Sequence, residues 1–423
     1  MTKRFLITIS IVFAIIMGIM VSIISACVNN QDSWRIKETG VLLAKPRSIE
    51  RIGDFLSKNE DKMEINLAKI NETKSICIDD RVINRDTLII DGNSGTFEDL
   101  SIQTKAKNLV VRNISVKNEK SSFLLMEGKF VTLELESVAV EVEKSANGIE
   151  LKGERCLLTI GERNTVRAGY GDLGQDGCSA IIGKNIEFFA KEGDLAKLEL
   201  YGGNGGRGIS GLDGEDGYSY NPATRTSNSW GAGEDGTDGG DGKNGRDGHS
   251  SGQGGDALVV QEEITVNKNV LLTCIGGDSN QSGSGGRGGD GGVGQGARNP
   301  SGPLKINTYK GGDGGDGAQG GSGAAEARPG AAVVCSKITI NSAAKVTCQR
   351  GKRGAPGKAG IGGKGALGGF GSEGSVTDWD GAERERAPAG KKGEDGKPGK
   401  ILNNNEIFDY IISVVNGKII TTT

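Results

Sequence analysis

The chain has 423 residues with 51 basic and 54 acidic side chains, so its net charge of −3 says little about its function. Glycine supplies 72 residues, about 17% where soluble proteins average roughly 7%, and aromatic residues only 4%. This composition argues against one large globular core, and 8 prolines are too few for collagen. The one histidine, His249, lies in a glycine repeat, which disfavours histidine metal sites and Ser-His-Asp or Cys-His catalysis. We expect a non-enzymatic protein without cofactor or metal, apart from weak calcium binding by surface aspartates.

A targeting segment begins the chain. Lys3 and Arg4 precede an uncharged stretch that ends in Ile-Ser-Ala-Cys at Cys27. Small residues before the cysteine suit signal-peptide cleavage. The segment resembles the lipobox of bacterial lipoproteins, which implies removal of residues 1–26 and lipidation of Cys27. The alternative is an uncleaved anchor helix. Both place the remainder in the bacterial cell envelope, outside the cytoplasmic membrane.

Six further cysteines lie in a compartment that permits disulfides. Cys274 and Cys348 occupy matching places in a repeat, which favours small apolar core residues over a disulfide framework. Whether any pair oxidises stays open at this point. The six are Cys77, Cys156, Cys178, Cys274, Cys335 and Cys348.

Short alternating strands recur after residue 60. Residues 259–267 (VVQEEITVN) match residues 333–341 (VVCSKITIN) at an offset of 74, and 148–158 and 181–202 look like earlier copies. Recurring strands with matching turns and no crossover helices predict an all-β parallel solenoid that buries alternate residues.

Residues 108–114 (NLVVRNI) resemble coils of the pectin-lyase-like parallel β-helices, and the likeness extends over residues 75–200. The resemblance implies a right-handed solenoid. Ahead of it, Ile49, Ile52 and Phe55 have helical spacing and predict a short amphipathic cap over the first coil.

Glycine is concentrated in three segments, 201–255, 276–330 and 351–400, which hold 56 of the 72 glycines. Each segment begins where a predicted strand ends and stops where the next coil starts. We therefore interpret them as hairpins inserted at one place in successive coils, and call them hairpins 1, 2 and 3.

Within each hairpin, glycine falls on every third residue along two runs around a tip. A period of three indicates a polyproline-II-type helix, in which six triplets extend roughly 55 Å. Glycine along one edge lets another backbone approach closely. The alternative is a flexible glycine linker.

A second glycine occurs in seven of eight triplets of hairpin 2, but in three of twelve of hairpin 1 and two of ten of hairpin 3. A middle hairpin with neighbours on both sides needs glycine on a second edge. The pattern resembles the polyglycine-II bundles of the springtail antifreeze protein and of glycine-rich phage tail-fibre adhesins. It implies a six-helix bundle used as an ice-facing plate or as a stalk that presents its tips; the charged faces disfavour the plate.

The few aromatic residues gather at the hairpin tips with arginines, where they suit contact with glycans or protein surfaces. The alternative is that the rings only clasp the hairpin ends. Hairpin 1 is acidic and hairpin 3 basic, which usually serves solvation; the alternative is lateral association of neighbouring molecules. The candidate ligand-binding residues are Tyr218, Tyr220, Trp230, Tyr309, Trp379, Arg384 and Arg386.

We therefore expect an adhesion or binding lipoprotein, with no nucleic-acid partner because bases and aromatics do not interleave. The alternatives are a purely structural envelope protein and a carbohydrate-active β-helix that uses early aspartates, namely Asp79, Asp80, Asp86, Asp91 and Asp99. Whether the last strands close the solenoid or pair with another molecule stays open. The predicted organisation is a signal peptide (1–26), a linker (27–45), the cap and solenoid (46–200), hairpins 1–3 with coils between them (256–275 and 331–350), and C-terminal strands (401–423).

Overall fold

The computed structural model describes residues 35–36, 41–43, 62–67, 76–81, 86–192, 196–223, 234–298, 309–370, 386–402 and 418–422. Across these ranges the chain consists of strands, turns and extended segments, without helices. The described residues therefore contain no helix long and apolar enough to cross a membrane. The predicted cap helix and Cys27 lie outside the described residues.

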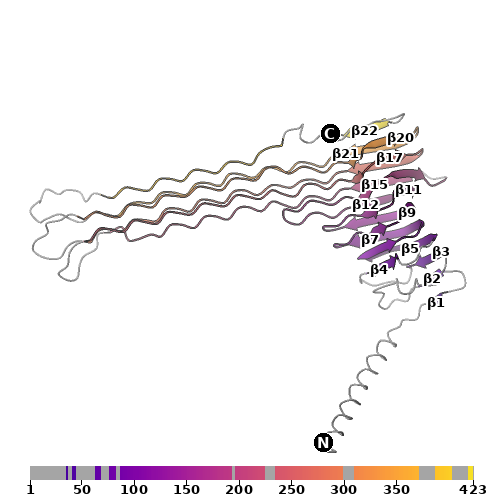
Figure 1. Ribbon diagram of the computed structural model, residues 1–423, viewed down its shortest axis with the longest axis horizontal. Coiled ribbons are helices and arrows are strands. Elements are labelled where there is room, and N and C mark those ends of the chain that lie inside the picture. The colour runs from indigo at the N-terminus through magenta and orange to yellow at the C-terminus, as the bar shows by residue number, and fades with distance from the viewer. Residues whose placement is uncertain are drawn as a thin grey trace, which may run out of the picture.

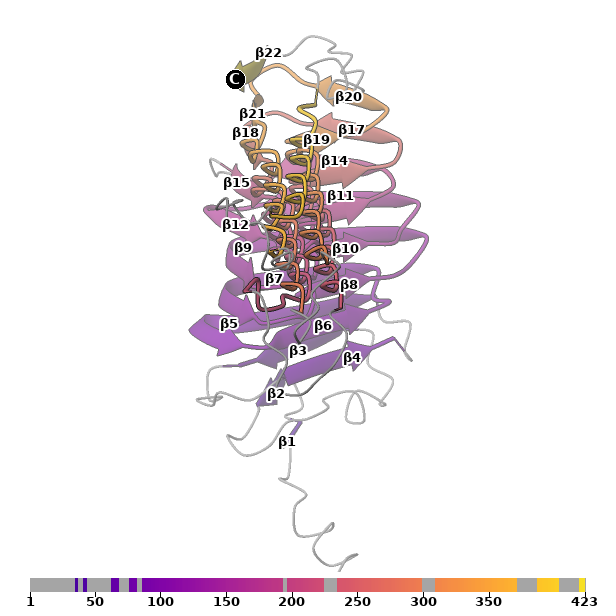
Figure 2. The same cartoon turned by 90° about the vertical axis from the view of Figure 1, so that its left-hand side faces the viewer.

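The strands form two sheets that stack coil upon coil, and long arms leave the stack on one side (Figures 1 and 2). Every strand pair is parallel except β1 with β2, which confirms the expected all-β, solenoid-like architecture. The smaller sheet contains β4 (Ile76–Asp80), β6 (Leu100–Thr104), β8 (Leu124–Met126), β10 (Ile149–Leu151), β13 (Ile181–Gly183), β16 (Leu258–Val260) and β19 (Val333–Val334).

The larger sheet has 15 strands, two of which, β1 and β2, fall within the predicted linker. They are β1 (Arg35–Ile36), β2 (Val41–Leu43), β3 (Lys62–Asn66), β5 (Thr87–Glu98), β7 (Asn108–Asn118), β9 (Phe130–Val142), β11 (Arg155–Ile160), β12 (Asn164–Arg167), β14 (Ile186–Ala190), β15 (Ala196–Tyr201), β17 (Glu263–Val266), β18 (Val270–Ile275), β20 (Lys337–Ile340), β21 (Lys345–Gln349) and β22 (Lys418–Thr422).

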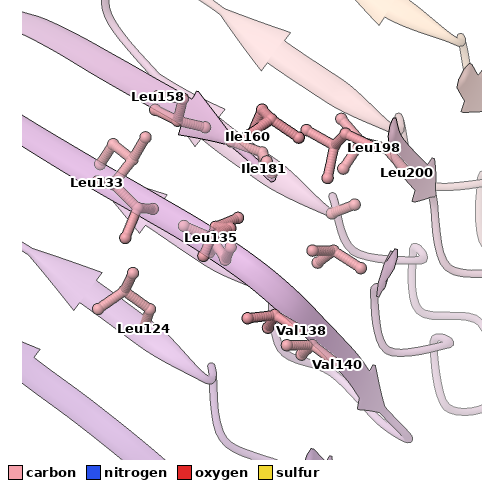
Figure 3. Close-up of a cluster of buried hydrophobic side chains, with 14 of the residues drawn as sticks. Leu124, Leu133, Leu135, Val138, Val140, Leu158, Ile160, Ile181, Leu198 and Leu200 are labelled. Atoms are coloured by element: carbon pink, nitrogen blue, oxygen red, sulfur yellow. The ribbon is translucent and has the colours of Figure 1, made fainter. Parts of the chain in front are cut away.

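The core lies between the sheets and is built by alternation. In β15, Leu198 and Leu200 are fully buried while Lys197 and Glu199 point outward. Residues at paired positions on neighbouring coils are buried in the same way, so leucine, isoleucine and valine side chains stack from coil to coil (Figure 3). Burial of each such side chain contributes about 1.5–3 kcal/mol. Side-chain burial is thus what holds the solenoid together.

The strand pairing between successive coils follows the predicted offset of 74 residues in the larger sheet but differs from it in the smaller sheet. Cys274 pairs with Cys348 at the predicted offset of 74. In the smaller sheet, however, Val259 pairs with Val334 and not with Val333, so the offset there is 75 and the predicted alignment was wrong by one residue. This pairing places buried Val333 directly over buried Leu258 of the preceding coil. The turn that leads into β20 is therefore one residue shorter than the turn that leads into β17.

The C-terminal strand continues the stack. Strand β22 pairs in parallel with β21, with Val346 opposite Ile419. The described end of the predicted C-terminal strands, residues 418–422, thus pairs within its own chain, and residues 407–417 of that prediction lie outside the described residues.

Candidate binding surface on the glycine-rich arms

The arms leave the solenoid at one corner. In successive coils, the strand that precedes an arm is β15, β18 or β21, and these three strands pair with one another. Each hairpin consists of an outgoing arm and a return arm that run antiparallel, as the bonds from the N–H of Lys243 to the carbonyl of Glu215 and from Arg246 to Leu212 show. The three hairpins are therefore stacked layers, set by the coils beneath them (Figure 1).

One triplet of hairpin 2 shows how the arms are joined. Gly288 donates its N–H to Ile361 of hairpin 3 (2.8 Å), and Gly289 donates to Lys243 of hairpin 1 (2.9 Å). Asp290 donates to the Oδ1 atom of Asp216 (2.8 Å). Three successive amides thus point to three neighbouring arms, as a chain with three residues per turn would direct them. Buried backbone donors need such partners, and here other arms supply them.

The glycines lie where no side chain fits. A Cβ on Gly288 would overlap the backbone of Ala318 in the return arm of the same hairpin, and a Cβ on Gly289 would overlap Glu215 in the layer below. The two glycines of one triplet therefore contact two different neighbours. These contacts agree with the reason given for double glycines in hairpin 2, which has a layer on each side.

A fourth, shorter hairpin was missed by sequence reasoning. Residues 169–178, the base hairpin, follow β12 and lie beneath hairpin 1, where Gly171 donates to Asn204 (2.8 Å). A Cβ on Gly203 or Gly206 would overlap this hairpin, and from Ile209 onward the same edge of the arm carries larger residues. The signal was present in the sequence, because Gly171, Gly174 and Gly177 are three residues apart.

The third residue of many triplets has a structural role that the sequence did not reveal. The Oδ1 atoms of Asp238 and Asp241 accept the N–H groups of Asp313 (2.7 Å) and Asp316 (2.7 Å) one layer up. Asp316 in turn accepts from Lys391 of hairpin 3 (2.6 Å). These aspartates form a ladder between layers. Members of the ladder in hairpin 1 are Asn204, Asp213, Asp216, Ser219, Asp235, Asp238, Asp241, Asn244 and Asp247, and Asp256 makes the same bond to Ala331 just after the hairpin ends.

The ladder explains the charge gradient. Six acids of hairpin 1 serve as acceptors for hairpin 2, whereas hairpin 3 has no described layer above it and needs few. In its described arms, residues 351–370 and 386–400, hairpin 3 has nine bases and two acids.

The structure places four of the predicted tip residues at the far end of the arms. Tyr218 and Tyr220 make an edge-to-face contact with ring centroids 4.7 Å apart, and Tyr218 is 70% exposed. The guanidinium of Arg386 lies 4.4 Å from the ring centre of Phe370. Tyr309 is half-buried at the start of its return arm. Trp230, Trp379 and Arg384 lie outside the described residues.

Other contacts at this end join the hairpins. Glu234 and Arg298 bridge hairpins 1 and 2 by paired backbone bonds and a 3.7 Å ion pair. Phe370 donates its N–H to Pro222 of hairpin 1 (3.0 Å). Sequence reasoning did not select Phe370, although it ends a glycine run and is aromatic. The clasping role predicted as an alternative therefore applies to Phe370 with Arg386, while the exposed ring of Tyr218 remains available for contact.

The early aspartates are engaged locally. Asp79 pairs with Arg81 (2.7 Å), Asp86 with Lys107 (2.5 Å) and Asp91 with Arg112 (2.8 Å). Asp99 accepts the N–H of Glu119 (2.9 Å), and Asp80 is buried at the end of β4. Among the described residues, no three acids, histidines or cysteines are grouped so that they could hold a metal ion.

The six cysteines described are free thiols. Cys274 and Cys348 are buried at paired positions, as predicted for small apolar residues. Burial raises the pKa of the Cys348 thiol to about 11 and that of Cys274 well above its usual value. These two side chains serve packing.

No family model, curated protein or solved structure matches the chain. The geometry of the arms and their tips therefore supplies the support for a function.

Proposed function

We propose that the chain is a lipid-anchored bacterial envelope protein whose arms form a six-helix polyglycine-II bundle on a right-handed, pectin-lyase-like solenoid. In this proposal the bundle is a rigid stalk, and its tips bind a glycan or a protein on another surface without catalysis. The lipobox-like segment at Cys27 is the only support for the anchor, and the strand pattern is the support for the type of solenoid.

One observation carries the proposal: successive amides of the arms donate to different neighbouring arms, so the arms support each other without a side-chain core. A chain tied at every turn resists bending, which a flexible linker does not. A long rigid projection serves binding when its far end makes contact, and Tyr218 and Tyr220 lie at that end. Trp230 and Trp379, which the sequence predicts at the tips, follow the outgoing arms of hairpins 1 and 3 in the chain. Aromatic side chains supply large contact areas at low entropic cost.

Binding to glycan arrays and to immobilised cell-surface proteins tests this proposal. We expect the full chain to bind at least one ligand, and the pairs Tyr218→Ala/Tyr220→Ala and Trp230→Ala/Trp379→Ala each to weaken that binding about tenfold or more. The matched control is Phe130→Ala, which removes an aromatic ring that is 62% exposed on the solenoid.

Two results would contradict the proposal. Equal losses in Phe130→Ala and in the tip variants would place the ligand away from the tips. Turnover of a polysaccharide that disappears on neutralising Asp79 and Asp91, with tip variants unaffected, would favour the carbohydrate-active alternative instead.

A further inference from the structure

The described arms of hairpin 3 carry a row of lysines whose ammonium groups form no ion pair within the described residues. The ammonium groups of five exposed lysines lie within ion-pair distance of no carboxylate in the described part of the chain. These five are Lys352, Lys358, Lys364, Lys391 and Lys397, and we call them the lysine ridge.

Several lysines and arginines of the solenoid form ion pairs, unlike those of the ridge. Lys191 pairs with Glu134 (2.8 Å) and Glu136 (2.7 Å), and Lys337 with Glu263 (2.7 Å). Arg112 likewise lies between Glu64 and Asp91. These solenoid bases are paired with acids one or two coils away, whereas the five lysines of the ridge recur along one hairpin without such ion pairs.

The ridge is fixed by its backbone and not by its side chains. Lys352, Lys364 and Lys391 donate their N–H groups to Asp278 (2.6 Å), Asp290 (2.7 Å) and Asp316 (2.6 Å) of the layer below. Any residue with a backbone N–H could donate these bonds, so the contacts between layers do not require lysine at these positions. On the outgoing arm, lysines recur every six residues, and Lys352 to Lys364 spans roughly 37 Å at the rise of a polyproline-II-type chain.

A second copy of this chain is a poor partner for the ridge. Copies held on one surface by the proposed lipid anchor would stand side by side, with hairpin 3 of one copy next to hairpin 3 of its neighbour. Lysines would then face lysines, and the aspartates of hairpin 1 would face aspartates. Like charges at short range repel. A flat anionic membrane is also a poor fit, because Lys364 stacks above the outgoing arms and Lys391 above the return arms, on separate flanks.

We propose that the lysine ridge binds a linear polyanion, a phosphate- or carboxylate-bearing polymer that lies along hairpin 3. Lysine ammonium groups act as point charges that suit such polymers without sequence or geometric specificity. This proposal concerns residues distinct from the tips and stands whether or not the tips have a ligand.

Fluorescence anisotropy of the full chain with labelled long-chain polyphosphate, and separately with labelled poly-L-glutamate, tests the ridge. We expect binding to at least one polymer that weakens steeply with salt, and a loss of about tenfold in the triple variant Lys352→Gln/Lys358→Gln/Lys364→Gln. The matched control is Lys117→Gln/Lys129→Gln/Lys152→Gln, which removes the same charge from the solenoid surface. The two polymers distinguish phosphate from carboxylate as the preferred group.

Three results would overturn the proposal. Equal losses in the ridge and control variants would mean that net charge alone attracts the polymer. Binding to phosphatidylglycerol vesicles but to neither polymer would make the partner a membrane. No binding of the unaltered chain to either polymer would leave the ridge without the proposed role.

Discussion

The solenoid and the arms are both stacks of layers, but the layers are held together by opposite means. In the solenoid, buried side chains such as Leu198 and Leu272 fill the space between sheets, and the backbone bonds run only to the coils above and below. In the arms, the neighbouring backbones fill the space themselves, and glycine is required because a Cβ would occupy it. One region is therefore sensitive to the loss of atoms and the other to their addition.

The largest effect is expected from adding a side chain within the arms. Gly289→Leu would place a Cβ against the backbone of Glu215, so hairpin 2 must separate from hairpin 1. We expect the amides around Gly289 and Lys243 to lose most of their protection in hydrogen exchange, while strands such as β9 keep theirs. The control is Lys364→Leu, at an exposed position one layer up. Slow exchange in the Gly289 variant would contradict the proposed close contact of backbones.

Removing atoms from the solenoid comes next. Leu272→Ala in β18 should lower the free energy of unfolding by about 2–5 kcal/mol, because this fully buried side chain leaves a cavity. Urea unfolding followed by circular dichroism measures it. The same change at Leu212, which is 65% exposed on hairpin 1, should alter stability by less than about 0.5 kcal/mol. Equal effects at the two leucines would remove the distinction between the regions.

A smaller effect is expected from acid on the ladder between layers. The Arg287 side chain, and then the N–H of Lys364, hold the pKa of Asp290 below its usual value, and the N–H of Gly362 does so for Asp395. A carboxylate with a lowered folded pKa stabilises the fold above the unfolded value, about 3.9, and that contribution is lost as pH falls through the folded value. Partial burial raises the pKa of Asp256, which is half-buried, and this carboxyl opposes the trend.

Amide exchange of Lys364 and Gly362, corrected for intrinsic rates, should therefore accelerate several-fold between pH 5 and pH 3, with solenoid amides unchanged. Asp290→Asn keeps an acceptor oxygen but cannot titrate, so the pH response at Lys364 should disappear in it. Persistence of the response there would show that Asp290 is not its source.

The smallest effect concerns the thiols. Because burial raises the pKa of Cys348 to about 11, this thiol should react far more slowly with a disulfide reagent at pH 8 than partly exposed Cys77 does. Mass spectrometry after brief labelling measures the order. Early labelling of Cys348 would indicate that the last coils open readily, which would sharpen the contrast with the inner solenoid.

Local pattern was enough to predict much of this molecule. Alternation fixed the strands, and triplet phasing with double glycines indicated which hairpin lies between two others. The ladder could not be predicted, since the partner of Asp241 is Asp316, 75 residues later, and only the register of the arms brings them together. The base hairpin was missed because three glycines, from Gly171 to Gly177, are too few to stand out beside runs of six triplets. The error at Val259 has a similar cause, because a one-residue difference at a corner leaves both candidate pairings apolar.

The base hairpin also shows that the length of the arms and the number of stacked layers vary independently in this architecture. It lies on its own coil, as the three longer hairpins do, yet ends after a few turns without disturbing the layer above. A further triplet in each arm would carry the tips roughly 9 Å farther out and leave the coils untouched. A further coil would add a layer and leave the reach unchanged. Insertion or loss of whole triplets is thus a route by which related chains could set the distance at which they meet a partner.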